Sequence, residues 1–363
     1  MKKILFSAAA LCLLLVAACG PKTATKGAHL VPKENFDEKI DTIPVQLYTI
    51  TNGTILAQVT NYGARMVSLY TADRNGKADN ILVGRSSLKD YQVARGERLL
   101  GAVSGPLHGT VGGGSFTMDG VSYNIDPSYG LDKLPWTVQS YADSLIRMQL
   151  IIPDGAGGLP GKRIFQVTYA LSGNGLMVLL RGFGNVKTPI SLAWQPWFNL
   201  HGEGEGTIED HELSIAGITY LPLDENGVPT GEFAPTADTP YDFISGPVVG
   251  DRLNQQKGGF NNTWCLAFEQ RLPIHLACEL TDPVSGRKLT VFTNRSALQM
   301  ATGDQFDGSI VGSNGKPIDK HGAILLAPTD LPDAVNHSNF PSVIVEEDGF
   351  FASTLLYRFE TIE

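Results

Sequence analysis

Residues 165–169 read Phe-Gln-Val-Thr-Tyr, and this alternation of apolar and polar side chains decides the fold class. Because successive side chains of a strand point to opposite faces of a sheet, a period of two predicts a half-buried β-strand. The same alternation returns at residues 355–360, and residues 289–293 form another short strand candidate. Asn-Gly and Asp-Gly turn sequences separate such stretches, and the sequence contains no long amphipathic pattern and no internal repeat. We therefore expect an all-β protein with one large antiparallel domain over residues 40–363.

The overall composition agrees with a globular protein and excludes several other classes. Of 363 residues, 42% are hydrophobic and 18% are charged, which does not fit a disordered, collagen-like or multi-span membrane chain. The formal net charge is −9, and no Lys/Arg run occurs in the body of the chain. Since nucleic-acid binding depends on clustered positive charge, no nucleic-acid partner is expected.

The N-terminus has the features of an export signal. Two lysines are followed by an apolar stretch over residues 4–18, which ends in small residues directly before Cys19. This stretch is short for a membrane-spanning helix, and its end resembles a bacterial lipobox, in which Cys19 becomes the lipidated first residue. An ordinary signal peptide with an incidental cysteine is the alternative. We expect a signal peptide at 1–18, a polar lipidated tether at 19–39, and an exported lipoprotein on the periplasmic face or cell surface, held to the membrane by lipid alone.

Cys265 and Cys278 are the cysteines of the predicted domain. The stretches 263–268 and 274–280 are strand-like, and a hairpin between them would place the two cysteines opposite each other. An exported protein meets oxidising conditions, so a cross-strand disulfide is one interpretation and two buried thiols are the other. No cysteine or histidine has metal-ligand spacing, and no metal is expected. The glycine-rich residues 109–114 lack the features of a phosphate-binding loop.

Ordered blocks along the chain resemble the aldose 1-epimerase (galactose mutarotase) family. Residues 197–202, Trp-Phe-Asn-Leu-His-Gly, are similar to the family's Tyr-Phe-Asn-Leu-x-Gly. Further blocks in the family's order are 61–69, 73–77, 81–84, 100–102, 158–161, 229–232, 239–243 and 327–341. The resemblance implies a β-supersandwich fold, a free hexose bound in an open cleft, and no cofactor.

The family's catalytic positions are substituted in this chain. The resemblance implies a histidine acid three residues before Phe-Asn-Leu and a glutamate base just before the Pro-Asp-Ala block. Gln195 stands at the acid position and Ala327 at the base position. An amide does not titrate near neutral pH, and a methyl group cannot accept a proton.

The family's sugar-binding positions also differ. Asn261 stands where the family has a binding Asp, and Thr110 where it has a binding Arg. The loop that carries a second histidine in the family is missing before residue 130. Gln195 and Asn261 are still suitable partners for sugar hydroxyls. Trp197 and Trp194 would either stack on a sugar face or pack in the core, and Trp136 is expected in the core.

Three hypotheses follow from these substitutions. The first is a carbohydrate-binding lipoprotein, for a mono- or oligosaccharide, that is weak or inactive as an epimerase. The second is a working hexose mutarotase with relocated acid and base, for which Asp330, His201 and His108 are the candidates. The third is a surface interaction protein that binds no sugar. An open cleft lined by Gln195 and Asn261 would favour the first, a carboxylate–imidazole pair across it the second, and a refilled cleft the third.

Overall fold

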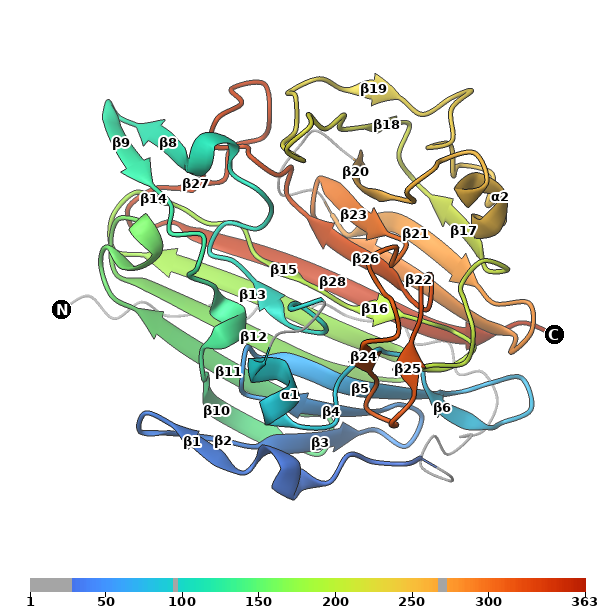
Figure 1. The fold of residues 1–363 in the computed structure, drawn as a ribbon. Helices are drawn as coiled ribbons and strands as arrows, with labels where there is room; N and C mark the ends of the chain where they lie inside the picture. Colours follow the sequence, from blue (N-terminus) through green and yellow to red (C-terminus); the bar gives the residue numbers. More distant parts are fainter. Residues whose placement is uncertain (1–27, 94–96, 267–272) are drawn as a thin grey trace.

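One eight-stranded antiparallel sheet forms a whole side of the molecule. The structure is a computed structural model that describes residues 28–93, 97–266 and 273–363. In spatial order, the sheet contains β10 (Thr137–Ala142), β11 (Leu145–Ile152), β12 (Arg163–Ser172), β13 (Gly175–Gly184), β28 (Phe350–Thr361), β22 (Arg287–Thr293), β21 (His275–Thr281) and β17 (Glu212–Ile215) (Figure 1). The predicted strands at 165–169, 289–293 and 355–360 are confirmed as parts of β12, β22 and β28.

The apolar residues of β12 place one face of this sheet against the core. Phe165, Val167 and Tyr169 are fully buried, whereas Gln166 between them is only partly buried. The Tyr169 hydroxyl donates a hydrogen bond to the Ala64 carbonyl at 2.8 Å, which joins the sheet to the layer above it. The apolar side chains of the sheet therefore face the other elements, as the period of two predicts.

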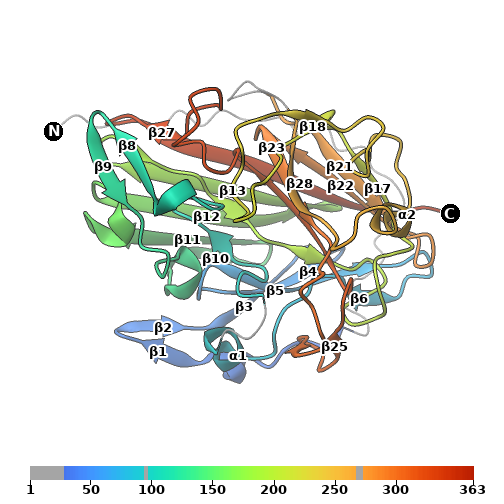
Figure 2. The ribbon, with the colours of Figure 1, turned by 45° about the horizontal axis from the view of Figure 1, so that its top comes forward.

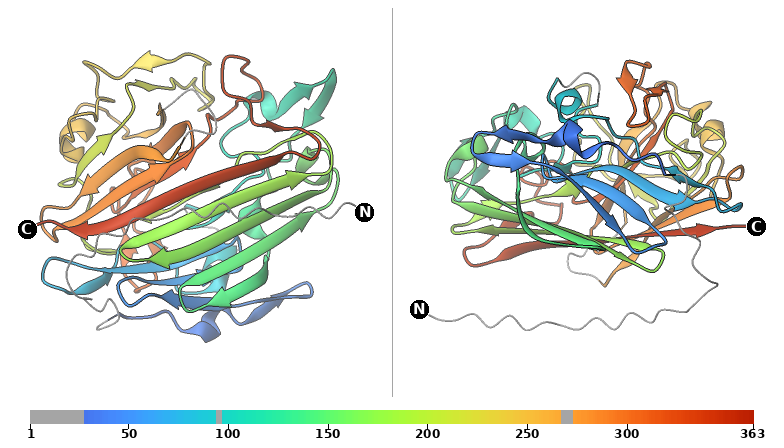
Figure 3. Two further views of the ribbon diagram at one scale, coloured as in Figure 1. Left: turned by 180° about the vertical axis from the view of Figure 1, so that it is seen from behind. Right: turned by 90° about the horizontal axis from the view of Figure 1, so that it is seen from below.

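The second layer consists of a four-stranded and a six-stranded sheet. Seen from behind and from below, the eight-stranded sheet lies on one side of the molecule and the other elements lie on its opposite face (Figure 3). The four-stranded sheet contains β3 (Leu47–Thr51), β4 (Leu56–Thr60), β5 (Arg65–Ala72) and β6 (Ala78–Asn80). The six-stranded sheet contains β16 (Trp197–Phe198), β26 (Ile324–Thr329), β23 (Ala297–Ala301), β20 (Asn261–Cys265), β18 (Thr219–Tyr220) and β19 (Ala234–Pro235).

Short two-stranded sheets and single helical turns complete the fold (Figure 2). The two-stranded pairs are β1 (Glu38–Ile40) with β2 (Ile43–Val45), β7 (Val103–Ser104) with β15 (Ala193–Trp194), β8 (Ser115–Met118) with β9 (Val121–Asn124), β14 (Thr188–Pro189) with β27 (Ile344–Val345), and β24 (Ile310–Val311) with β25 (Pro317–Ile318). The helical turns are α1 (Leu88–Gln92), α2 (Val249–Leu253), η1 (Lys33–Phe36), η2 (Gly112–Gly114), η3 (Leu131–Lys133) and η4 (Ala156–Gly158). Across the described residues, every helix is too short or too polar to cross a membrane.

The hairpin predicted around the two cysteines is wrong. Cys265 ends β20 in the six-stranded sheet, whereas Cys278 lies in β21 of the eight-stranded sheet. β20 pairs with β23 and β18, and β21 pairs with β22 and β17. Both cysteines are buried free thiols, and burial raises the pKa of Cys265 to about 11. Two strand-like stretches close in sequence thus belong to different layers, because each pairs with strands from other parts of the chain.

The predicted tether extends too far toward the domain. Residues 1–18 and Cys19, which carry the signal-peptide and lipidation predictions, lie outside the described residues. Val31 exchanges two hydrogen bonds of 2.9 Å with the buried Gln58 side chain, and Phe36 is fully buried. The chain is therefore packed on the body from about Val31 onward, before the predicted boundary at residue 39.

Candidate functional site

A cleft of about 510 Å³ brings together most of the residues that the sequence singled out. His108, Thr110, Gln195, Trp197 and Asn261 all line it. They come from the loop after β7, from the segment after β15 and the first residue of β16, and from the first residue of β20. The long-range pairing of these segments, and not their order in the chain, therefore creates the cleft. A neighbouring hollow of about 500 Å³ beside β8 contains none of these predicted residues.

Backbone pairing holds Gln195 and Ala327, the two positions that the sequence resemblance assigns to the acid and the base, in place. The Gln195 N–H donates to the Ala102 carbonyl at 2.9 Å, and the Gln195 carbonyl accepts from the Gly101 N–H at 2.8 Å. The Gln195 side chain is 3% exposed, and among the described residues its amide nitrogen has no partner. Ala327 in β26 lies opposite Gln299 in β23 and is fully buried. Neither position thus provides a group that exchanges a proton near neutral pH.

His108 lines the cleft as a neutral, fully bonded imidazole. Its Nδ1 lies 2.7 Å from the Ser104 hydroxyl, and its Nε2 lies 3.0 Å from the Gln299 side-chain oxygen. Burial lowers the pKa of His108 to about 4, against the opposing effects of the Gln299 hydrogen bond and the Asp330 charge. Both ring nitrogens are engaged with protein groups, so His108 has no free nitrogen to act as a relocated acid or base.

Asp330 is committed to an ion pair and does not line the cleft. Its carboxylate is 2% exposed and pairs with the Arg295 guanidinium, which lies 4.8 Å from the ring centroid of Phe351. A buried carboxylate in this position compensates the charge of the arginine. The structure therefore does not place Asp330 where a bound sugar could reach it.

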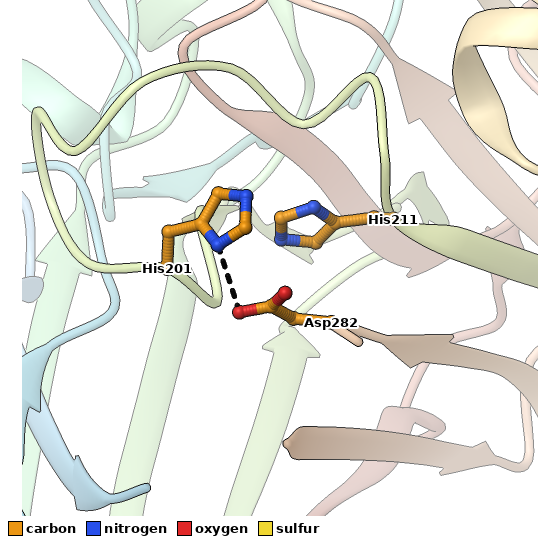
Figure 4. A group of neighbouring side chains, drawn as sticks. All are labelled: His201, His211 and Asp282. Atoms are coloured by element: carbon orange, nitrogen blue, oxygen red, sulfur yellow. Dashed lines mark ion pairs between the residues drawn. The ribbon is translucent and has the colours of Figure 1, made fainter. Parts of the chain in front are cut away.

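His201, the third candidate for relocated chemistry, also lies away from the cleft lining. Its ring is held between two carboxylates. Its Nε2 lies 2.8 Å from Asp210, and its Nδ1 lies 2.9 Å from Asp282 (Figure 4). The His211 ring lies beside it, with centroids 4.7 Å apart. The hydrogen bond to Asp282 is the main cause that raises the pKa of His201. Two carboxylate acceptors require two N–H donors, so this geometry favours an imidazolium.

The ligand atoms of His201, His211 and Asp282 lie within 4.8 Å of one another, which raises the question of a metal site. His211 Nε2 accepts a hydrogen bond from the Leu200 N–H at 3.1 Å, and its Nδ1 lies 3.2 Å from Asp210. Asp282 accepts from the backbone N–H groups of residues 284 and 285. The imidazole lone pair that a metal would need is therefore already used, and the chemistry of this group is that of a hydrogen-bonded ion pair.

Charged groups and amides that sequence reasoning missed also line the cleft. Glu97, Arg98, Asp126, Asp132 and Gln299 belong to this set. Arg98 lies 3.4 Å from Asp132, whose side chain is 2% exposed. One sequence signal was available for Gln299, which interrupts the apolar run Ala-Leu-Gln-Met-Ala at 297–301. These side chains provide the donors and acceptors that a polyhydroxylated ligand requires.

The tryptophans pack in the protein interior. Trp136 is fully buried, which confirms the prediction for it. Trp194 is also fully buried, donates from Nε1 to the Gly101 carbonyl at 2.9 Å, and lies edge-on to Tyr357, so it takes the core role of its two alternatives. Trp197 lines the cleft but is only 2% exposed, so it offers a ligand little of its ring face.

The fold and the cleft define the class of this protein: a large antiparallel β-sandwich with a polar cleft of small-molecule size. The family model for aldose 1-epimerase matches residues 46–358, and the chain belongs to this family. It is 31% identical over 326 residues to human galactose mutarotase, covering 87% of this chain and 94% of the relative. It is 26% identical over 315 residues to the aldose 1-epimerase of Escherichia coli K12, covering 82% and 90%.

Solved structures share the fold. A homologue of aldose epimerase from C. elegans superposes with a TM-score of 0.80 at 19% identity, over 88% of this chain and all of that one. Galactose 1-epimerase from Lactobacillus acidophilus gives 0.77 at 24% identity, over 90% and 97%. The fold class and the family resemblance drawn from the sequence are thus confirmed.

Proposed function

We propose that this chain is a sugar-binding member of the aldose 1-epimerase family that does not epimerise its ligand efficiently, and that it is exported and anchored by lipid at Cys19. The observation that carries the proposal is the pair Gln195 and Ala327 at the family's acid and base positions, in a chain that keeps the cleft. An acid and a base each contribute roughly 10²–10⁴-fold to such a reaction. Losing both removes most of the catalytic power while leaving binding groups in place.

The surroundings of the three substitute candidates argue against relocated catalysis. His108 has both nitrogens bonded, Asp330 is paired with Arg295, and His201 bridges Asp210 and Asp282 outside the cleft lining. The size of the cleft, about 510 Å³, lies in the usual range for small-molecule sites. This size supports a cleft that binds a ligand over one filled by side chains. Relatives named galactose mutarotase and aldose 1-epimerase support a sugar as that ligand.

The test is calorimetric titration of the full chain in detergent with a panel of hexoses and oligosaccharides, followed by polarimetry of any binder with freshly dissolved α-anomer. We expect binding without mutarotation above the buffer rate. Asn261→Ala should weaken binding, whereas Arg181→Ala, on the exposed face of β13, should leave it unchanged. Acceleration that Gln195→Ala leaves intact would establish relocated catalysis, and no binding at millimolar sugar would favour the interaction-protein hypothesis.

The anchoring part of the proposal has its own test. Cys19→Ala removes the acceptor for lipid, so the variant should leave the membrane fraction after cell fractionation. Unchanged membrane retention of the variant would refute lipidation at Cys19, and a cytosolic location of the parent would refute export.

A further inference from the structure

The glycine-rich residues 109–114 lie between two hollows of the protein surface. Four residues of this loop line the cleft of about 510 Å³, namely Gly109, Thr110, Val111 and Gly114. Gly112 lines the neighbouring hollow of about 500 Å³, together with the first three residues of β8. We call this second space the β8 hollow. Because residues of one short loop face the two spaces in turn, only the thickness of this loop divides them.

Two side chains from residues 332–336 hold this loop in place. The Gly112 N–H donates to the carboxylate of Asp333, which is 6% exposed, at 3.0 Å. The Asn336 side-chain nitrogen donates to the same carboxylate at 2.7 Å and to the Ser115 carbonyl at 3.0 Å. The loop is therefore ordered by contacts within the protein, and a ligand that crosses it does not have to order it on binding.

The exposed part of the loop carries no side chain. Gly113 and Gly114 are exposed and have φ angles of 62° and 63°, a left-handed conformation that favours glycine. Apart from its chain neighbours, a Cβ added at Gly114 would meet no atom of the described residues within 4 Å. A Cβ at Gly113 would meet only Ser115 Oγ, at 3.9 Å. The space beside η2 is thus open, and a ligand can pass over the glycine backbone from the cleft to the β8 hollow.

The β8 hollow presents groups that suit a polyhydroxylated ligand. Thr117 of β8 and Ser122 of β9 pair across the two strands, both are exposed, and their hydroxyls lie 3.3 Å apart. Asn336 also lines the hollow, and hydroxyl and amide groups both donate and accept hydrogen bonds. The described residues that line the hollow include no Lys, Arg or His, and Asp333 is acidic. This lining therefore favours a neutral ligand over an anionic one.

We propose that the β8 hollow is a second sugar subsite, and that the ligand of this chain is a neutral oligosaccharide with one unit in the cleft and further units that cross η2 into the hollow. This inference rests on the proposed sugar-binding function, which requires only that the cleft binds a sugar. Two additional neutral hydrogen bonds in the hollow correspond to roughly 5- to 100-fold tighter binding of the oligosaccharide than of its monosaccharide.

The first measurement is calorimetric titration of the full chain in detergent with a length series of neutral sugars. The series contains glucose, galactose and mannose and their linear oligosaccharides of two to six units. We expect Kd to fall roughly 5- to 100-fold from the monosaccharide to the shortest oligosaccharide that reaches the β8 hollow. Longer members should then bind equally well, because their additional units lie in solvent.

Ser122→Leu tests the β8 hollow directly, because it removes a hydroxyl and fills the hollow without altering a residue of the cleft lining. We expect Kd for the monosaccharide to stay unchanged and the gain with chain length to disappear. Val121→Leu is the matched control. It places the same side chain at the preceding residue, which is 52% exposed and lies outside both linings, so this variant should keep the gain.

Gly113→Asn tests the crossing point, because it places a side chain on η2 between the two spaces. Asparagine tolerates the left-handed conformation that this position requires. Oligosaccharide binding should weaken to the monosaccharide level. Gly120→Asn, in the turn between β8 and β9, is the control, since Gly120 has a φ of 76° and open space around its Cβ position but lies outside both linings.

The outcomes separate this inference from the proposed function. If the parent binds a monosaccharide and no oligosaccharide binds more tightly, the inference fails and the function stands. If an oligosaccharide binds more tightly but Ser122→Leu and Gly113→Asn both keep the gain, the further units bind elsewhere and the inference is overturned. The same holds if the two control variants lose the gain as well. If the parent binds no sugar of the series, the proposed function and the inference both fail.

Discussion

Removing the His201 imidazole should lower the free energy of unfolding by about 2–3 kcal/mol. The ring connects the loop after β16 to the turn between β21 and β22, through Asp210 and Asp282. The Asp282 side chain is 0% exposed and the Asp210 side chain 50% exposed. A hydrogen bond to a buried charged group contributes about 1.5–3 kcal/mol, and a half-exposed ion pair about 0–1 kcal/mol. The loss stays below that of a fully unpaired buried charge because Asp282 keeps its backbone donors.

The assay is urea unfolding of the full chain and His201→Ala, followed by tryptophan fluorescence. His321→Ala is the matched control, because His321 also bridges two carboxylates, Glu209 and Asp304. Those two side chains are 51% and 20% exposed, so the control should lose less stability. Equal losses in the two variants would contradict the argument from the burial of Asp282.

The pH dependence gives the prediction its sign. The pKa of His201 is raised in the folded protein, so its contribution is fully present below the unfolded value of about 6.5 and is lost as the pH rises through the folded pKa. The pKa of His211 is lowered mainly by burial, which gives an opposite trend in both proteins; His201 adds only a smaller lowering effect. The stability difference between parent and His201→Ala should thus shrink from pH 6 toward alkaline pH. A difference that is constant or grows with pH would refute the imidazolium bridge.

Three further predictions concern other parts of the molecule. Glu203→Gln should lower the free energy of unfolding in urea by about 2–3 kcal/mol. This carboxylate is 1% exposed and accepts hydrogen bonds from three backbone N–H groups and two side chains, so the amide nitrogen of a glutamine would face donors. A loss within experimental error would mean that solvent reaches the site. Gln195→His combined with Ala327→Glu should accelerate mutarotation of a bound hexose by about 10²-fold in polarimetry, with each single change giving less; a folded, binding double variant without acceleration would show that other losses dominate. Reductant should change neither the mass nor the melting temperature, because Cys265 and Cys278 are free and in different sheets, and a mass increase of two hydrogens would reveal a disulfide.

The strands and the fold class were predictable from the sequence, because the pattern of side chains along a strand has a local physical cause. The alternation at 165–169 follows from burial on one face of a strand. In β12 the apolar residues of this stretch are buried and Gln166 is only partly buried, although Thr168 is buried as well. The ordered motifs across the chain predicted the family fold. The sequence also shows that the side chains at positions 195 and 327 do not titrate near neutral pH, because titration is first a property of the residue type.

Only the tertiary structure decided which side chains meet. Cys265 and Cys278 lie close in sequence but in different sheets, because strand partners are chosen by packing and register over long separations. His108 and His201 looked equally suited to the cleft, yet His108 lines it and His201 ties two carboxylates elsewhere. The sequence by itself therefore determined the fold class and the side-chain types at positions 195 and 327. The tertiary structure decided which group each polar side chain bonds. The hydrogen bond between His108 and Gln299 is an example, because no local sequence pattern encodes a contact between residues so far apart.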